Sequence, residues 1–365
     1  MNGPIPKPGI MDIEPYLGGS SRIEGKNRII KLSSNEGALG PSPMAVKAYE
    51  KAAATIHRYP DGGAQILRAA IGEANDLDPA RIVCGAGSDE LICNLCRAYA
   101  GPGDEVVYSE HGFLMYAIYA KAVGARPVAA TETDLTADVA ALLGRVTAGT
   151  RILFLANPNN PTGSYLRINT LKDLRAGLRD DVLLVIDAAY AEYLDAGDYD
   201  PGRALVDASV GNGDNVVMTR TFSKLYAMGG LRLGWAYCPP PIADALNRLR
   251  GPFNVSAAAQ AAGTAALADK IFIGRVKAHN DTWLPWTRTK LINLGLDVPP
   301  GAGNFLLVRF GGGEAATACD GFLKSRGIIV RRMVAYGLAD SLRVSIGAED
   351  EMRAFIDAVA DFMKA

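Results

Sequence analysis

The sequence contains a lysine with the surroundings of a possible nucleophile. Lys224 directly follows Ser223 in the stretch Met218–Trp235, where most neighbours are apolar or small. An apolar environment favours the neutral amine, and a neutral amine can attack a carbonyl carbon to form a Schiff base. Thr221, Ser223 and Arg232 could together bind one phosphate group. A strand–loop–strand with an ordinary lysine explains this stretch equally well when it is considered alone.

A second candidate site is the small-residue run at Gly85–Asp89, which follows a strand-like segment and opens a helix. Small residues let backbone N–H groups of a helix N-terminus approach an anion, so the run predicts a phosphate site. A dinucleotide-binding fingerprint is the alternative. Glu90, however, stands where the third glycine of that fingerprint belongs, and Glu105 lies at the start of the next strand rather than at its end.

Further polar or aromatic residues follow other strand-like segments. Asp187 closes a buried strand, where a carboxylate needs a cationic partner such as a protonated pyridine nitrogen. Tyr190 could then reach a neighbouring oxygen, and Asn157, the first residue of NPNNPTG, could donate a hydrogen bond to a ligand. Phe113 could stack on a planar ring. Simpler explanations remain for each residue, such as an aspartate that caps a turn and a phenylalanine of the core.

The elements that position these residues alternate between strand and helix from residue 81 to residue 238. This alternation predicts an α/β fold with a mostly parallel sheet covered by helices on both faces. In such sheets, ligands bind beyond the carboxyl ends of the strands. The expected strands are 81–84, 105–109, 126–130, 151–156, 182–187, 215–220 and 233–238, and the expected helices include one at 134–143.

The pattern changes after Pro239, where longer helices and three further strands predict a smaller α+β unit. Residues 1–30 are rich in proline, glycine and serine, and we expect them to form an arm that packs with this smaller unit. The predicted division is therefore an arm at 1–30, a large domain at 31–260 and a small C-terminal domain at 261–365.

Composition restricts the class of protein. The 365 residues include 38 Lys and Arg against 39 Asp and Glu, so no basic face for nucleic acid or an anionic membrane is expected. No secretory signal or membrane-length apolar run is present, and we expect a cytoplasmic protein. Cys93 and Cys96 form the single CxxC, which we interpret as helix packing, so no metal site is predicted.

The order of these motifs resembles that of the fold type I pyridoxal-phosphate-dependent aminotransferases of class II. The similarity is strongest to the histidinol-phosphate aminotransferase branch and extends over nearly the whole chain. The motifs that carry it are KLSSNE, RYPDGG, GAGSDEL, NPNNPTG, DAAYAEY, RTFSK, GLRLGW, GNFLLVRF and LRVSIG.

This resemblance implies that the chain binds pyridoxal 5′-phosphate covalently through Lys224, which also transfers the proton at the substrate's alpha carbon. Asp187 would pair with the pyridinium nitrogen. Tyr190 and Asn157 would contact the phenolic oxygen, and Phe113 would stack on the ring. The residues implied for the phosphate are Ser88, Asp89, Thr221, Ser223 and Arg232.

The resemblance also implies a homodimer with shared active sites, because Tyr59 in RYPDGG corresponds to a residue that reaches the phosphate of the neighbouring subunit. Arg343 would bind the substrate carboxylate. Arg331 and Tyr16 would bind the phosphate of histidinol phosphate, and Asn35, in the loop at the substrate entrance, would also contact the substrate.

The implied reaction converts L-histidinol phosphate and 2-oxoglutarate into imidazole-acetol phosphate and L-glutamate. One departure concerns specificity: relatives usually read NENPLGPSP, whereas this chain has Gly37 and Ala38 after Asn35-Glu36. We expect the additional glycine to loosen this loop. An aromatic or broad-specificity aminotransferase of the same branch is the closest alternative. A decarboxylase of a phosphorylated amino acid, an NAD-dependent oxidoreductase and a non-catalytic domain are more distant ones.

Overall fold

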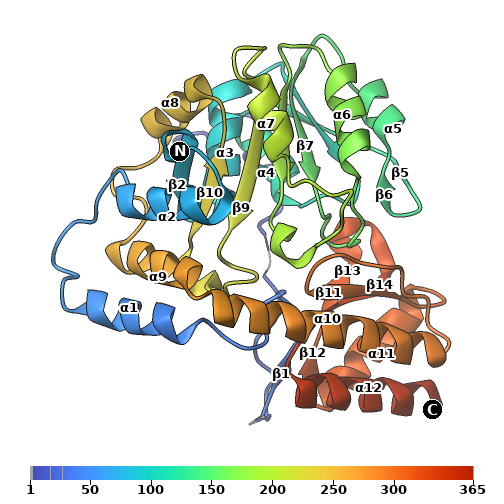
Figure 1. Cartoon of the computed structure of the whole chain (residues 1–365). Helices are drawn as coiled ribbons and strands as arrows, with labels where there is room; N and C mark the ends of the chain where they lie inside the picture. Colours follow the sequence, from blue (N-terminus) through green and yellow to red (C-terminus); the bar gives the residue numbers. More distant parts are fainter. Residues whose placement is uncertain (1–2, 17, 27, 365) are drawn as a thin grey trace.

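A seven-stranded sheet forms the centre of the larger part of the molecule (Figure 1). The computed structural model describes residues 3–16, 18–26 and 28–364; residues 1, 2, 17 and 27 of the predicted arm, and Ala365, lie outside this description. All strands run parallel except β10, which is antiparallel to both of its neighbours. In spatial order the strands are β2 (Ile82–Gly85), β10 (Gly234–Tyr237), β9 (Val216–Thr221), β8 (Leu183–Asp187), β7 (Thr150–Ala156), β3 (Glu105–Ser109) and β4 (Arg126–Ala130).

Helices cover both faces of this sheet, as the predicted α/β class requires. Successive residues of a strand point to opposite faces, and in β7 Ile152 and Phe154 face one apolar cluster while Leu153 and Leu155 face the other. The first face is covered by α3 (Ser88–Tyr99), α4 (Met115–Ala122) and α8 (Pro240–Leu249). The second is covered by α2 (Gln65–Asn75), α5 (Val139–Gly144), α6 (Ile168–Gly177), α7 (Arg203–Ser209) and α9 (Ala257–Ala268), with α1 (Pro43–Ala53) packed on α9.

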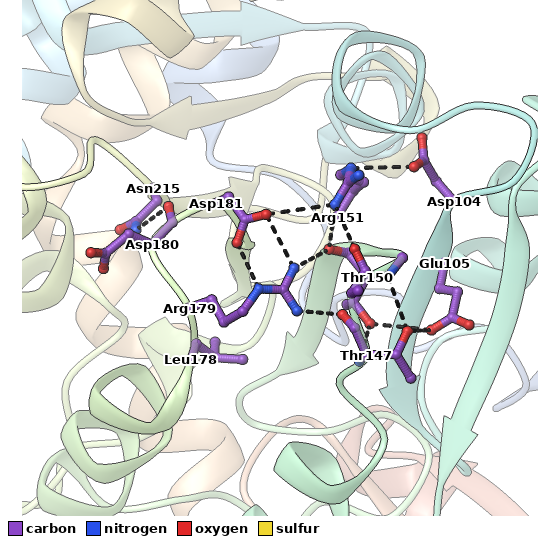
Figure 2. Close-up of polar contacts among 12 residues, drawn as sticks. Asp104, Glu105, Thr147, Thr150, Arg151, Leu178, Arg179, Asp180, Asp181 and Asn215 are labelled. Atoms are coloured by element: carbon purple, nitrogen blue, oxygen red, sulfur yellow. Dashed lines mark hydrogen bonds and ion pairs between the residues drawn. The ribbon is translucent and has the colours of Figure 1, made fainter.

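The amino ends of the strands are joined by a polar network on the side of the sheet opposite the carboxyl ends (Figure 2). Glu105, the first residue of β3, accepts hydrogen bonds from Thr147 Oγ1 at 2.7 Å and Thr150 Oγ1 at 3.2 Å. Arg179 reaches the Thr150 carbonyl at 3.2 Å and pairs with Asp181 at 2.8 Å. The network therefore fixes the strand starts relative to one another.

A smaller unit contains a three-stranded antiparallel sheet in the order β11, β14, β13. Its strands are β11 (Phe305–Arg309), β13 (Arg331–Met333) and β14 (Leu338–Ser345), and its helices are α11 (Gly313–Ser325) and α12 (Glu349–Lys364). Beside it, β1 (Ile30–Lys31), at the end of the arm, pairs in parallel with β12 (Ile328–Ile329). The long helix α10 (Lys270–Asn293) runs from α9 along this unit (Figure 1).

Packing bears on where the domain boundary lies. Ala262, Ala266 and Leu267 of α9 belong to the same apolar cluster as α1 and α2 of the large unit. Trp283 and Leu291 of α10 belong instead to the cluster of the small unit. We therefore propose that the boundary lies between α9 and α10, a few residues beyond residue 260.

One predicted element is wrong in its first half. The expected helix at 134–143 is a short hairpin of β5 (Glu132–Thr133) and β6 (Thr136–Ala137), followed by α5, which begins only at Val139. Asp134 and Leu135 occupy the left-handed region at φ 48° and 59°, as a two-residue hairpin turn requires. The Asp138 side chain then caps α5 by accepting from Ala141 N at 3.0 Å.

No helix in the described ranges combines the length and the apolar character needed to cross a membrane.

Candidate active site

A cavity of about 460 Å³ lies at the carboxyl ends of the large sheet, between that sheet and the small unit. Its walls include residues from β8, β9, the N-terminus of α3 and strands β13 and β14. Of the predicted site residues, all except Asn157 and Tyr59 line it. Those residues are Tyr16, Asn35, Ser88, Asp89, Phe113, Asp187, Tyr190, Thr221, Ser223, Lys224, Arg232, Arg331 and Arg343.

Lys224 reaches this cavity because it lies three residues beyond the fully buried strand β9. Its Nζ donates a hydrogen bond to the Ser34 carbonyl at 3.4 Å and lies 5.5 Å from the centre of the Tyr190 ring. In the described part of the chain, Lys224 forms no ion pair with a carboxylate. The amine is therefore held at the cavity by weak contacts and is available to a carbonyl ligand.

Asp187 is a buried carboxylate at the end of β8. It accepts hydrogen bonds from Tyr116 Oη at 2.8 Å and from Thr219 Oγ1 at 3.2 Å. Burial raises the pKa of Asp187, and these two hydrogen bonds only partly offset that effect. Two neutral hydroxyls do not supply the positive charge that a buried carboxylate requires. A protonated ring nitrogen bound in the cavity would supply it.

Ser88 and Asp89, which we predicted to bind a phosphate, lie where β2 leads into α3. A side chain at Gly87, whose φ is +85°, would come within 2.6 Å of Arg232 Nη2, and a side chain at Gly234 would collide with the Ser88 backbone nitrogen. Both glycines are therefore required for Arg232 and the first turn of α3 to approach each other. The Asp89 carboxylate accepts from Tyr119 Oη at 2.7 Å, which leaves the backbone N–H groups of this turn for an anion.

Two hydroxyl groups that we also predicted to bind the phosphate lie close together. Thr221 Oγ1 donates to Ser223 Oγ at 3.0 Å and accepts from the Ser223 backbone N–H at 3.1 Å. The tight turn after β9 thus brings both hydroxyls together at the cavity, whose lining also includes Arg232.

The two residues predicted to contact the phenolic oxygen lie in different surroundings. Tyr190 lines the cavity, and its hydroxyl accepts a hydrogen bond from Asn35 Nδ2 at 2.8 Å. Asn157 is fully buried behind the cavity wall, and its side-chain amide forms two hydrogen bonds with the backbone of Leu166 at 2.7 and 3.1 Å. Direct contact between Asn157 and the cofactor stays a prediction.

Phe113 lies on the cavity wall and packs edge-on against Tyr116, with ring centroids 5.8 Å apart. Tyr59 lies outside the cavity of its own chain. Its side chain is 82% exposed and stacks on Phe253 at 4.6 Å. This exposure is compatible with the predicted contact to a second subunit, which a single chain does not test.

The small unit contributes two arginines to the cavity. Arg343 is buried; its Nη1 donates to Asn160 Oδ1 at 2.5 Å and its Nη2 to the Ser33 carbonyl at 2.8 Å. Burial lowers the pKa of Arg343, and its Nε has no hydrogen-bond partner in the residues that the structure describes. The Arg331 guanidinium lies 5.9 Å from the centre of the Tyr16 ring. Two guanidinium groups thus face this end of the cavity and can bind anionic groups of a substrate.

The loop at 35–40 packs closely against the segment that carries Lys224, although its glycines had suggested a loose loop. A side chain at Gly37 would come within 2.5 Å of Ala227 Cβ and 3.2 Å of the Lys224 carbonyl. Gly37 does not occupy the left-handed region, so the close approach explains why a glycine stands there. The loop therefore rests directly on the lysine-bearing segment, contrary to our expectation that the glycine loosens it.

Several residues that act at the site were not identified from the sequence. Tyr116 and Thr219 bond to Asp187, Asn160 bonds to Arg343, and Tyr336 lines the cavity beside Arg331. Asn160 belongs to NPNNPTG, and this motif could have suggested it. No sequence signal distinguishes Tyr116, Thr219 and Tyr336 from ordinary core residues.

This donor set fits pyridoxal phosphate. A carboxylate without a cation faces the cavity beside an amine without an anion, and a glycine-lined helix N-terminus adjoins an arginine and two hydroxyls. Of the described residues, no three or more His, Cys, Asp or Glu side chains are grouped to hold a metal ion, and the five cysteines are free.

Known proteins are similar to this chain in sequence and in fold. The family model "Aminotransferase class I and II" matches residues 27–359. A histidinol-phosphate aminotransferase from Paramagnetospirillum magneticum is 61% identical over all of both chains. One from Rhodospirillum rubrum is 56% identical over 99% of this chain and 97% of its own. The crystal structure of a histidinol-phosphate aminotransferase from Sinorhizobium meliloti in complex with pyridoxal-5′-phosphate superposes with a TM-score of 0.86. It is 29% identical, with 92% of each chain covered.

Proposed function

Because this chain belongs to the class I and II aminotransferase family, with pyridoxal 5′-phosphate as its cofactor, we propose that it transaminates L-histidinol phosphate. The second substrate is 2-oxoglutarate, and the products are imidazole-acetol phosphate and L-glutamate. The proposal draws its main support from the relatives of that name, which are 61% and 56% identical over essentially their whole length.

The observation in the cavity that favours this substrate is the pair of guanidinium groups at its small-unit end. Arg343 is buried and held by Asn160 and Ser33, so it presents a fixed fork that suits the carboxylate of glutamate. Arg331 lies beside the partly exposed aromatic ring of Tyr16. That position suits a phosphate that enters between the arm and β13.

When bound, pyridoxal phosphate acts as the electron sink that makes the alpha proton of the amino substrate acidic. Asp187 would balance the positive charge of the pyridinium nitrogen and keep it protonated, and Lys224 Nζ would accept the alpha proton and return it. Thr221, Ser223 and Arg232 anchor the phosphate, so the reacting carbon stays within reach of the Lys224 amine.

A substrate panel tests the proposal. We expect kcat/KM to be higher for histidinol phosphate than for phenylalanine or tyrosine. A tenfold or greater preference for the aromatic amino acids would establish the aromatic aminotransferase instead. Release of carbon dioxide without glutamate would indicate a decarboxylase.

The role of Arg331 can be tested against its neighbour. Arg331→Gln should raise KM for histidinol phosphate about ten- to hundredfold, because a charge-assisted contact to the phosphate is lost. Arg332→Gln is the matched control, since Arg332 does not line the cavity, and it should leave KM unchanged. Equal effects of the two changes would argue against a phosphate contact at Arg331.

We also propose that the enzyme is a homodimer with shared active sites, located in the cytoplasm. The exposed Tyr59–Phe253 stack and the exposed side chains of Met44, Tyr49 and Ile56 support an apolar contact face. The cytoplasmic location is supported by the five free cysteines, which are typical of proteins in a reducing compartment. Light scattering tests the dimer, and fractionation of the source cells tests the location.

A further inference from the structure

The segment Ser33–Asn35 links three functional groups of the cavity. The Ser33 carbonyl accepts from Arg343 at 2.8 Å, and the Ser34 carbonyl accepts from Lys224 at 3.4 Å. The Asn35 side chain donates to Tyr190 at 2.8 Å. Asn35 is only 1% exposed and takes an unusual backbone conformation with φ +55°. A buried asparagine in this position must have its side-chain atoms satisfied by specific partners.

Those partners form a chain of hydrogen bonds from the small unit to Tyr190. Ser345, the last residue of β14, accepts from the Asn35 backbone N–H at 2.7 Å, and its own hydroxyl donates to Asn35 Oδ1 at 3.0 Å. The other end of the same amide, Nδ2, donates to Tyr190 Oη. Asn304 Nδ2 holds the Asn35 carbonyl at 3.1 Å.

This series of hydrogen bonds determines which group donates in the contact between Asn35 and Tyr190. The Ser345 hydroxyl has one proton, and Asn35 Oδ1 is the acceptor that it reaches in the described structure. That contact orients the amide so that Nδ2, a donor, points at Tyr190. The Tyr190 oxygen therefore acts as an acceptor toward Asn35, and its own proton is left to point into the cavity. In the reverse amide orientation, Asn35 Oδ1 would accept a hydrogen bond from the Tyr190 hydroxyl, and this hydroxyl would no longer donate into the cavity.

We propose that Ser345 and Asn35 are positioning residues that direct the Tyr190 hydroxyl proton into the cavity as a hydrogen-bond donor to the bound cofactor. Asn35 thus acts through Tyr190 and not as a substrate contact. The inference rests on the proposed function only in that the cavity holds pyridoxal phosphate, and it is independent of which amino donor is used. Because Ser345 belongs to the small unit, the donor direction depends on the position of that unit over the cavity.

The visible absorption of the bound cofactor gives a readout that does not require turnover. A hydrogen bond donated to the phenolic oxygen withdraws charge from it, so loss of that bond makes the conjugated nitrogen more basic. The pH midpoint of the absorption change should therefore rise. The charged and titratable groups that face Tyr190 are Lys224, Arg343, Tyr116, Tyr193 and Tyr336. The variants at Ser345 and Asn35 alter none of them.

We expect Ser345→Ala to raise this midpoint by about half a unit to one pH unit, the equivalent of one neutral hydrogen bond. Ser345→Thr retains the hydroxyl and should keep the wild-type midpoint. Ser341→Ala is the matched control: Ser341 is a buried serine on the same strand that bonds to Asp340. Its midpoint should also be that of the wild type.

A double-mutant cycle separates positioning from general disturbance. Tyr190→Phe should raise the midpoint at least as far as Ser345→Ala does, and adding Ser345→Ala to Tyr190→Phe should cause no further rise. An unchanged midpoint in Ser345→Ala, or an equal rise with and without the Tyr190 hydroxyl, would overturn the proposal. If Ser345→Ala does not fold, Asn35→Ala takes its place in the same cycle with the same expectations.

Failure of the proposed substrate would be distinguishable. It would appear as a preference for other amino donors in the substrate panel, with the spectroscopic cycle unchanged. Failure of the positioning inference would appear in the cycle with the substrate preference intact.

Discussion

Asp187 and Arg343 are buried groups of opposite charge, and neither forms an ion pair within the described parts of the chain. Arg220 is also buried in this region, but it pairs with Glu192 at 2.8 Å. A buried charge without a counterion is costly to the folded state. The two unpaired groups face one cavity, which indicates that their counterions come from ligands: a pyridinium for Asp187 and a carboxylate for Arg343.

Asp187→Asn tests this interpretation. The variant should bind the cofactor but lose roughly 10²–10⁴-fold in kcat/KM, because the buried partner of the pyridinium nitrogen is removed. A purified variant that is folded by circular dichroism and retains near-normal turnover would contradict the pyridinium assignment.

The same change should stabilise the cofactor-free protein at neutral pH. The pKa of Asp187 is raised above its ordinary value of 3.8, so ionisation of this carboxyl destabilises the fold as pH rises above that value. Asparagine does not ionise. Thermal unfolding without cofactor should therefore give a higher Tm for the variant at pH 7, and the gain should disappear below about pH 3.8.

The residues to which we assign chemical roles were easier to single out in the sequence than the residues that hold them. Asp187 closes, and Lys224 follows, a strand that is recognisable as an apolar run, and both residue types are unusual at such positions. Tyr116 and Ser345 have ordinary types for a helix and a strand, and they act only because the chain brings them next to Asp187 and Asn35. Sequence spacing does not encode contacts between residues 71 and 310 positions apart.

At the scale of elements, alternation of apolar segments predicted the seven strands of the large sheet because buried parallel strands are almost continuously apolar. The same reasoning failed at 134–138, where the acidic and apolar residues also suit the start of a helix. The hairpin depends on two left-handed residues, Asp134 and Leu135. Neither is a glycine or asparagine, which are the usual sequence signals for such a turn.

The loop at 35–40 and the lysine segment form a closely matched pair, which a compensating double mutant can test. Gly37→Ala should lower the free energy of unfolding by about 1–3 kcal/mol, because the new methyl group overlaps Ala227 Cβ. Ala227 has φ +53°, so Ala227→Gly should both remove the overlap and relieve backbone strain. Denaturant unfolding of the Gly37→Ala/Ala227→Gly protein should show recovery.

Gly18→Ala is the control for this pair, because no atom lies within 4 Å of the position that a Cβ would take at Gly18. The free energy of unfolding of the Gly18→Ala protein should differ little from that of the wild type. A Gly37→Ala protein as stable as the wild type would contradict the close packing of the loop on the lysine segment.

The network at the amino ends of the strands predicts a pH-dependent contribution to stability (Figure 2). Hydrogen bonds from Thr147, then Arg126 and Thr150, lower the pKa of Glu105 against the opposing effect of burial. Because its pKa is lower in the folded state, ionised Glu105 stabilises the fold at pH values above its unfolded-state pKa of about 4.5. This stabilisation is lost as the pH falls through the folded-state pKa.

Glu105→Gln should therefore reduce stability at pH 7 by about 1–2 kcal/mol, the equivalent of weakened hydrogen bonds to a charged acceptor. The difference from the wild type should shrink below pH 4.5, as measured by urea unfolding across pH. Glu349→Gln removes an exposed helix ion pair with Arg353 and should have little effect at any pH. Identical pH profiles for Glu105→Gln and the wild type would exclude the proposed role of the network.

At the scale of the whole molecule, the cavity depends on the large sheet, the small unit and the arm together. Lys224 and Asp187 come from the large sheet, Arg331 and Arg343 from the small unit and Tyr16 from the arm. The large and the small unit each have an apolar core of their own, and the segment Ser33–Asn35 connects Lys224 of the first with Arg343 of the second. The resemblance already assigned these residues to one site, and the structure places them around one cavity. The contacts that hold each of them there could not be predicted from the motifs.

Of the two predicted site residues that do not line the cavity, Asn157 is buried behind its wall and Tyr59 is exposed on the surface. The role of Tyr59 can therefore be tested only in an assembly. If Tyr59 serves the partner's site, Tyr59→Ala should weaken cofactor binding, and Lys224→Ala should abolish turnover. A mixed dimer of these two variants would then contain one site with both intact residues and should recover about half of the wild-type turnover per dimer at limiting cofactor. If Tyr59 acts within its own subunit, every site of the mixed dimer carries one substitution and no recovery is expected. Differently tagged chains, co-expressed and purified through both tags, allow this measurement, and the absence of recovery in a verified mixed dimer would rule out the shared site.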